Sequence, residues 1–313
     1  MPCDAPNHCC SQTAFRPFPD SALEGSITDR FSEQVTRHAE CIALVDGDLR
    51  LTYRELDAWA NGVAYSLSGG IEPVVVLVAQ GATYAAAVLG ALKCGRPYVP
   101  LEPVDPVARL RTFVESCGAT AVLSDSEHAE RVAEAIPGLP VVLVDDVAPV
   151  EGAPGVLIRA STVAYVFFTS GSTGTPKGVY DTHRNVLHNV MRYTNALEIA
   201  PSDGLTLLQG PAFSGCVSSQ FGALLNGATS YPFRLRQEGL LRAAAWLHRE
   251  PITMGVCSCC SGPLLSPRGH SEVAATIRAL RSPVAQLVEH PAVNRRVTGS
   301  SPVRGVTKYP QKH

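Results

Sequence analysis

The sequence contains no long apolar run and no strong excess of charge of either sign. Its hydrophobic stretches, such as PVVVLVA at residues 73–79, are far shorter than the roughly 20 residues that a membrane-spanning helix needs. The formal net charge of -2 gives no general attraction to polyanions or lipid surfaces, so we expect neither nucleic acid nor a membrane as a partner. The first residues, MPCDAPNHCC, place no apolar run behind a basic start, so no signal peptide is expected and a cytoplasmic location is predicted.

Paired cysteine motifs are absent as well. The ten cysteines are scattered along the chain, which in a cytosolic protein indicates reduced thiols rather than a disulfide framework. Two clusters have neither paired C-x-x-C spacing nor a following histidine pair, so no metal site is predicted there. They are Cys3, Cys9 and Cys10, and Cys257, Cys259 and Cys260.

Short apolar runs alternate with helical patterns over most of the 313 residues, of which 45% are hydrophobic. After a Pro-rich, loose lead-in at 1–24, the stretch ALVDGDLRLTY predicts a hairpin around Asp46-Gly47. Thr52 and Glu55 then form a capping box for a helix over 53–68. Strands are predicted at 74–79, 97–101, 120–125, 140–146, 164–170 and 205–210, and helices at 84–94, 106–116, 126–136, 182–194 and 238–250. The stretch SSQFGALLNGATSYPF (218–233) predicts a helix, a glycine stop and a further strand. This alternation predicts an α/β fold with parallel sheets covered by helices on both faces.

The most informative stretch is TSGSTGTPKGV at residues 169–179, directly after an apolar run. Glycines let backbone N–H groups turn inward, hydroxyls add donors and the lysine adds a compact positive charge, a combination that suits a polyphosphate. The spacing is not that of a Walker A loop, because Pro176 precedes Lys177 and Gly178 follows it. The alternative is a surface turn rich in small residues.

The stretch YVFFTSGSTGTPKGV (165–179) resembles the signature loop of the adenylate-forming superfamily, which includes acyl-CoA synthetases, luciferases and the adenylation domains of non-ribosomal peptide synthetases. Four more segments resemble motifs of that family in the same order: LTYRELDAWANGVAYSL (51–67), LKCGRPYVPLEPVDPVARL (92–110), DTHRNVLHNV (181–190) and AFSGCVSSQFGALLNGATSYPF (212–233). The resemblance covers residues 25–253 and implies the N-terminal part of the large domain of such an enzyme.

The resemblance implies ATP with Mg²⁺ and a carboxylic acid as reactants, giving an acyl-adenylate and pyrophosphate, with CoA or a phosphopantetheinyl carrier protein as acceptor. Such chemistry is mostly positioning and charge neutralisation. The residues implied to hold the phosphates or shape the loop are Thr169, Ser170, Gly171, Ser172, Thr173, Gly174, Thr175, Lys177 and Gly178. His183 matches a position near the reacting carboxylate; the alternative is a solvent-facing residue at a helix N-terminus.

The acid-pocket segment departs from the pattern of the amino-acid-activating members. In those members the phenylalanine is followed by an aspartate that binds the α-ammonium group, whereas here Phe213 is followed by Ser214. A serine supplies no opposite charge. The expected substrate is therefore a carboxylic acid without a free α-amino group.

Residues 254–313 resemble no part of the family, and the adenine, ribose and catalytic-lysine motifs are not found there. The stretch 282–305 resembles a translated tRNA gene, and we expect an unrelated tail after a break in the reading frame. A basic nucleic-acid-binding arm is the alternative. We therefore expect the C-terminal subdomain to be absent. An inactive, truncated fragment with residual phosphate binding is the competing interpretation.

Overall fold

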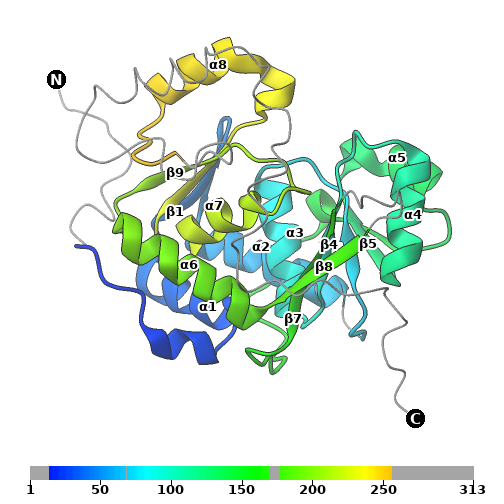
Figure 1. Cartoon of the computed structure of the whole chain (residues 1–313), viewed down its shortest axis with the longest axis horizontal. Helices are drawn as coiled ribbons and strands as arrows, with labels where there is room; N and C mark the ends of the chain where they lie inside the picture. The colour runs from blue at the N-terminus through cyan, green and yellow to red at the C-terminus, as the bar shows by residue number, and fades with distance from the viewer. Residues whose placement is uncertain (1–13, 68, 170–176, 256–313) are drawn as a thin grey trace.

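The computed structural model describes residues 14–67, 69–169 and 177–255, which form two β-sheets with helices packed on and between them (Figure 1). The strands are β1 (Ile42–Asp46), β2 (Leu49–Thr52), β3 (Val74–Val76), β4 (Tyr98–Pro100), β5 (Ala121–Ser124), β6 (Val141–Leu143), β7 (Val163–Thr169), β8 (Lys177–Thr182), β9 (Gly204–Leu207) and β10 (Thr229–Pro232). The helices are α1 (Ile27–His38), α2 (Tyr53–Ser66), α3 (Ala82–Lys93), α4 (Val107–Cys117), α5 (Ala129–Ala135), α6 (His183–Leu197), α7 (Gly215–Leu224) and α8 (Leu235–Arg249), with 3-10 turns η2 (Asp20–Glu24), η3 (Ser126–His128) and η4 (Val144–Asp146). The predicted α/β class is confirmed.

The larger sheet has the strand order β6-β5-β3-β4-β7-β8 and is parallel from β6 to β7. Val75 of β3 lies opposite Val99 on one side and Val122 on the other. All three residues of β3 are buried, because helices cover both faces of a parallel sheet. β8 alone runs antiparallel, as the return strand of a hairpin with β7.

The smaller sheet has the order β2-β1-β10-β9. β1 and β2 form the predicted antiparallel hairpin, and Gly47 in its turn has φ 60°, a conformation that glycine adopts without steric cost. The predicted capping box at the start of α2 is confirmed, since the Thr52 hydroxyl accepts from the Glu55 N–H and the Glu55 carboxylate accepts from the Thr52 N–H. β10 is parallel to both of its neighbours.

Three of the hydrophobic clusters show how the layers stack. The largest joins residues of both sheets, such as Leu44 and Val76, to helices α1, α2, α3, α6 and α7. A second cluster packs the opposite face of the larger sheet against α4 and α5, and a third packs the opposite face of the smaller sheet against α8 through Trp246. The two sheets therefore share a central helical layer, and each has its own outer helices.

Two elements were not predicted from the sequence. α1 begins with a capping box between Ser26 and Asp29 and buries Ile27 and Phe31. β8 occupies residues that were assigned to the glycine-rich loop and to the start of the next helix. In the expected lead-in, Phe18 is buried, and its N–H donates to the Asn195 side chain at 2.7 Å.

Several predicted boundaries were wrong. The strand predicted at 140–146 ends at Leu143, where η4 begins, and the strand predicted at 205–210 ends at Leu207. The helix predicted at 126–136 is η3 followed by α5. α8 begins before its predicted start and contains a non-helical Gly239.

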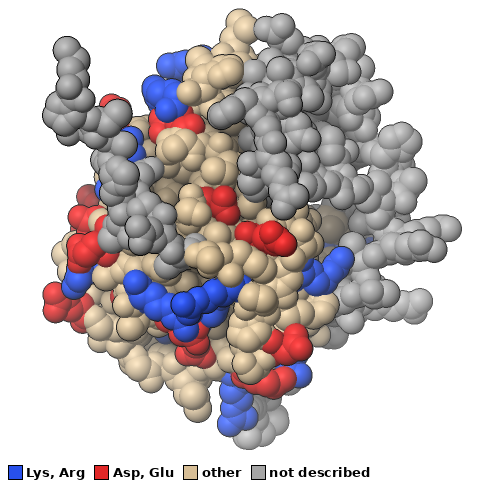
Figure 2. All heavy atoms as spheres, turned by 90° about the vertical axis from the view of Figure 1, so that its left-hand side faces the viewer, with Lys and Arg blue, Asp and Glu red and all other residues tan. Residues whose placement is uncertain are grey.

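The expectation of reduced thiols is confirmed for three of the four cysteines in the described ranges. Cys94, Cys117 and Cys216 are free and buried, whereas Cys41 is disulfide-bonded, so the expectation is wrong there. No helix in this part of the chain is both long enough and apolar enough to cross a membrane. Figure 2 shows Lys and Arg side chains lying beside Asp and Glu on the face that it presents.

Candidate functional site

The candidate site lies where neighbouring strands end. In a parallel sheet the carboxyl ends of the strands meet at one edge, and loops there form ligand sites. Glu102 follows β4, and Thr169 ends the adjacent β7. The turn at 210–214 follows β9 and is joined to Glu102 by a hydrogen bond from the Ala212 N–H. The two segments implied to hold phosphate and acid thus emerge near one another.

The predicted phosphate loop connects the two strands of a hairpin. Thr169 pairs with Lys177, and Phe168 pairs with Gly178. Lys177 and Gly178, which the sequence assigned to the phosphate loop, therefore belong to β8. The Thr169 hydroxyl lies 3.4 Å from the Lys177 carbonyl oxygen, and both residues are exposed. The remaining predicted phosphate contacts lie outside the described residues; they are Ser170, Gly171, Ser172, Thr173, Gly174 and Thr175.

Aromatic packing holds this hairpin on the sheet. Phe168 stacks on Phe113 of α4 with ring centroids 4.6 Å apart. On the other face, the Tyr165 hydroxyl donates to Asp181 of β8 at 2.5 Å. Burial, together with this carboxylate, raises the pKa of Tyr165, so its hydroxyl keeps the proton that it donates. The base of the hairpin is therefore rigidly supported on both faces of the sheet.

His183 is the first residue of α6 and is buried, so the solvent-facing alternative is wrong. Its Nδ1 accepts a hydrogen bond from the Ile27 N–H at 3.1 Å, at the first residue of α1. Burial lowers the pKa of His183 to about 4, although Asp29 opposes that shift. The ring is therefore neutral near pH 7, with its proton on Nε2, because Nδ1 is the acceptor.

Phe213 and Ser214 stand at the opening of α7. Phe213 is 49% exposed, and Ser214 is the N-cap of the helix without a side-chain capping bond. Glu102, which the sequence did not single out, lies against this turn. Burial raises the pKa of the Glu102 carboxyl, while the Ala212 N–H and the Arg236 guanidinium act in the opposite direction. The only local signal for Glu102 was its position directly after a buried strand.

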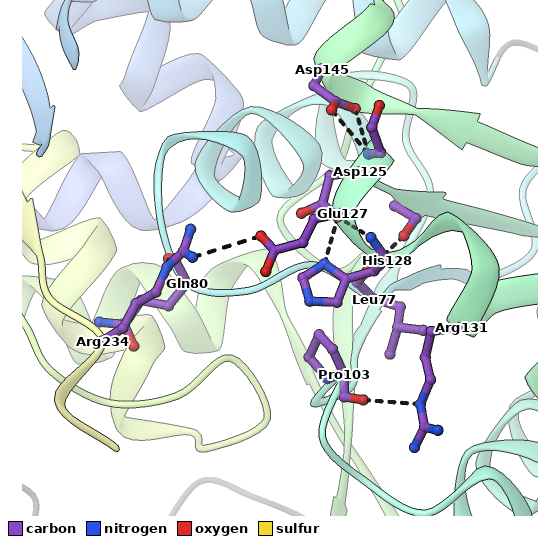
Figure 3. A network of polar contacts seen from close by, with 11 residues as sticks. Leu77, Gln80, Pro103, Asp125, Glu127, His128, Arg131, Asp145 and Arg234 are labelled. Carbon is purple, nitrogen blue, oxygen red and sulfur yellow. Dashed lines mark hydrogen bonds and ion pairs between the residues drawn. The ribbon is translucent and has the colours of Figure 1, made fainter. Parts of the chain in front are cut away.

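A polar network braces the neighbouring strand ends (Figure 3). Arg234, which follows β10, donates from Nε to the Gln80 carbonyl at 3.1 Å, and its Nη1 lies 3.9 Å from the Glu127 carboxylate. Beyond it, the Asp125 carboxylate lies 2.5 Å from Nδ1 of His128 and also accepts from the His128 N–H. These contacts link the two sheets, and sequence reasoning did not anticipate them.

Within the described residues, no group of three or more His, Cys, Asp and Glu side chains is placed to hold a metal ion. The two cysteine clusters considered from the sequence, at 3–10 and 257–260, lie outside those residues. The site offers instead an exposed lysine beside the Thr169 hydroxyl and an exposed aromatic residue beside a serine. Such groups can bind a polyanion and a small organic acid.

Comparison with known proteins matches residues 31–259 to the family described as AMP-binding enzyme. Tyrocidine synthase 3 from Brevibacillus parabrevis is 36% identical over 212 residues, which cover 66% of this chain and 3% of that protein. Cyclosporin synthetase simA from Tolypocladium inflatum is 34% identical over 256 residues, covering 75% of this chain and 2% of that protein. The chain thus spans a small fraction of the length of these relatives.

Solved structures give the same picture. The AMPPNP-bound form of a variant of the nonribosomal peptide synthetase FmoA3 matches with a TM-score of 0.66 at 29% identity, covering 78% of this chain and 26% of that chain. The N-terminal subdomain of Klebsiella oxytoca NpsA matches with a TM-score of 0.67 at 22% identity, covering 74% of this chain and 61% of that chain. The second likeness establishes the shared fold.

Proposed function

The chain belongs to the AMP-binding enzyme family, and from this premise we propose that it serves the ATP-dependent activation of a carboxylic acid. The carboxylate oxygen of the acid attacks the α-phosphorus of ATP, an acyl-adenylate forms and pyrophosphate leaves. A thiol then takes the acyl group and AMP leaves. Because FmoA3, which the chain resembles, is a nonribosomal peptide synthetase, a carrier-protein pantetheine is a more suitable acceptor than CoA.

The observation that carries this proposal is the β7–β8 hairpin, with Lys177 exposed at the end of the hairpin next to the connection and the hydroxyl-rich stretch 170–176 between its strands. A lysine and inward-turned N–H groups neutralise phosphate charge as pyrophosphate departs. In this proposal Thr169 and Ser170 to Thr175 contact the β- and γ-phosphates. FmoA3 with bound AMPPNP supports ATP as the nucleotide.

Mg²⁺ would arrive with the nucleotide. This ion keeps several water ligands and is usually held by substrate phosphates and one or two carboxylates. In this proposal the ion is carried mainly by ATP, since the described residues hold no group of three or more His, Cys, Asp and Glu side chains placed for a metal ion. When bound, it would neutralise phosphate charge beside Lys177.

The turn at 210–214 is proposed to meet the acid. Phe213 offers an exposed ring and Ser214 an uncharged hydroxyl, so the proposed substrate is a carboxylic acid without a free α-amino group. Neutral His183 would donate from Nε2, since its Nδ1 is occupied by the Ile27 N–H. Its role is then to orient an oxygen rather than to accept a proton.

The test is ATP–pyrophosphate exchange by the full 313-residue chain with aryl, fatty and amino acids. Exchange that depends on an aryl or fatty acid is the expected result. Faster exchange with amino acids would contradict the substrate class. Binding of AMPPNP without exchange would support the competing proposal, residual phosphate binding without turnover, and the absence of both would contradict the phosphate site itself.

A further inference from the structure

Glu102 reaches from the larger sheet to the turn that precedes α7. Its Oε1 accepts a hydrogen bond from the Ala212 N–H at 3.3 Å, across 110 residues of sequence. A Cβ at Gly210 would lie 2.1 Å from the same oxygen, so the carboxylate can approach this backbone only because residue 210 is glycine. The contact therefore depends on two features, the carboxylate of Glu102 and the missing side chain at Gly210.

The turn held by this contact presents the two residues of the acid-facing segment. The Phe213 N–H donates to the Gly210 carbonyl at 3.1 Å, which closes the turn around Ala212. The Phe213 ring lies close to Gly215, where a Cβ would come within 2.7 Å of it. A shift of Ala212 would thus redirect both Phe213 and Ser214.

The surroundings of Glu102 act on its carboxyl in both directions. Burial raises the pKa of this carboxyl and Asp105 adds to the shift, whereas the Ala212 N–H and the Arg236 guanidinium oppose it. Hydrogen bonds from backbone N–H groups to carboxylates are stronger than those to neutral acceptors. Tyr84 adds a contact on the same turn, since its hydroxyl lies 3.5 Å from the Pro211 carbonyl oxygen.

We propose that Glu102 is a positioning residue for acid selection: it holds Ala212, and through the turn it sets the directions of Phe213 and Ser214. This inference rests on the proposed function, because it assigns the turn to the acid rather than to the nucleotide. Glu102 acts through the backbone and does not itself contact the reacting atoms.

The first test follows amide hydrogen exchange in the full-length chain. Glu102→Ala should accelerate exchange at 210–214 by about tenfold or more, as expected for loss of a charge-assisted bond. Glu102→Gln keeps an acceptor oxygen without charge and should give a smaller acceleration confined to the same residues. Glu130→Gln, on the exposed surface of α5, serves as the control. Unchanged exchange at 210–214 in both Glu102 variants would overturn the proposal.

The second test separates acid from nucleotide. Glu102→Ala should raise the KM for the acid about tenfold and leave the KM for ATP within about twofold, with partial rescue in Glu102→Gln. Equal increases in both KM values would indicate general damage and would overturn the proposal. If the unmodified chain exchanges pyrophosphate with no acid, the proposed function fails, and hydrogen exchange alone then decides whether Glu102 positions the turn.

Discussion

Each sheet carries one antiparallel hairpin whose return strand lies at the edge of the sheet, and the two hairpins close differently. β1 and β2 are closed at Asp46 and Leu49, with only Gly47 and Asp48 between them. β7 and β8 are closed at Thr169 and Lys177, with residues 170–176 between them. Two residues are enough to reverse a strand, so the second connection is longer than a reversal requires, and in our proposal its additional residues hold the phosphates.

The two hairpins also share a feature. Each is tied to the first N–H of a helix by one polar side chain, which ends β1 in the first hairpin and directly follows β8 in the second. Asp46 Oδ2 accepts from the Ala82 N–H of α3 at 2.9 Å. His183 Nδ1 accepts from the Ile27 N–H of α1 at 3.1 Å. Such N–H groups have no partner within their own helix, so both ties satisfy a donor that would otherwise need another acceptor. The hairpins are anchored alike, whereas the segments that connect their strands differ in length.

The largest expected effect is a loss of pyrophosphate exchange that occurs when a cation of the second hairpin is removed but not when one of the first hairpin is removed. Lys177→Ala is expected to lower pyrophosphate exchange by about a hundred- to a thousandfold, because one charged contact to the departing phosphates is lost. Arg50→Ala, an exposed cation on β2 of the other hairpin, should leave exchange unchanged. Steady-state exchange rates and melting temperatures of both variants provide the measurement. Equal losses in the two variants would remove the functional distinction between the hairpins.

The next effect concerns the pH dependence of stability that arises from His183, whose ring accepts the Ile27 N–H beside the second hairpin. His183 is neutral when folded, with a pKa lowered to about 4, and it charges in the unfolded chain near the ordinary histidine pKa of 6.5. The unfolded state then binds more protons, so stability should fall as the pH drops from about 6.5 towards 4.

Between pH 7.5 and pH 5 this contributes a loss of about 2 kcal/mol in the free energy of unfolding. Urea titrations of His183→Gln should show a pH dependence weaker by that amount. His188→Gln, at an exposed position of the same helix, should retain the full dependence. If the free energy of unfolding had the same pH dependence in the unmodified chain, His183→Gln and His188→Gln, His183 would not be the group that titrates.

The smallest effect concerns the tie of the first hairpin. Asp46→Ala should lower the free energy of unfolding by about 1 kcal/mol, the usual cost of losing a helix cap. Asp46→Asn keeps an acceptor oxygen and should lose less. Neither change should alter the KM for ATP. Denaturant unfolding compared with exchange kinetics would detect any unexpected link between this hairpin and the site.

The comparison also explains what the sequence could predict. Asp46-Gly47 and the capping box of Thr52 and Glu55 are local signals, and the structure confirms both. β8 was missed because KGVYDT is mostly polar and lies at the sheet edge, half-exposed, where no apolar run is required. α1 was missed although Ser26 and Asp29 carry a local capping signal.

Long-range contacts account for the rest. The bond between Glu102 and Ala212 joins residues from different sheets, and no periodicity in the sequence encodes it. The burial of His183 depends on α1, which is more than a hundred residues away along the chain. Residue types and spacing indicated a phosphate loop. They could not show which side chains hold its surroundings in place.

Gln80, which follows β3 of the larger sheet, forms hydrogen bonds to three residues at the strand ends of the smaller sheet. Its side-chain amide donates to the carbonyls of Leu207 and Phe233, at the ends of β9 and β10, while its own carbonyl accepts from Arg234. These bonds join the end of β9 to the segment that follows β3. The acid-facing turn begins a few residues beyond Leu207, so the Gln80 side chain, together with the bond between Glu102 and Ala212, ties this turn to the larger sheet that carries the β7–β8 hairpin.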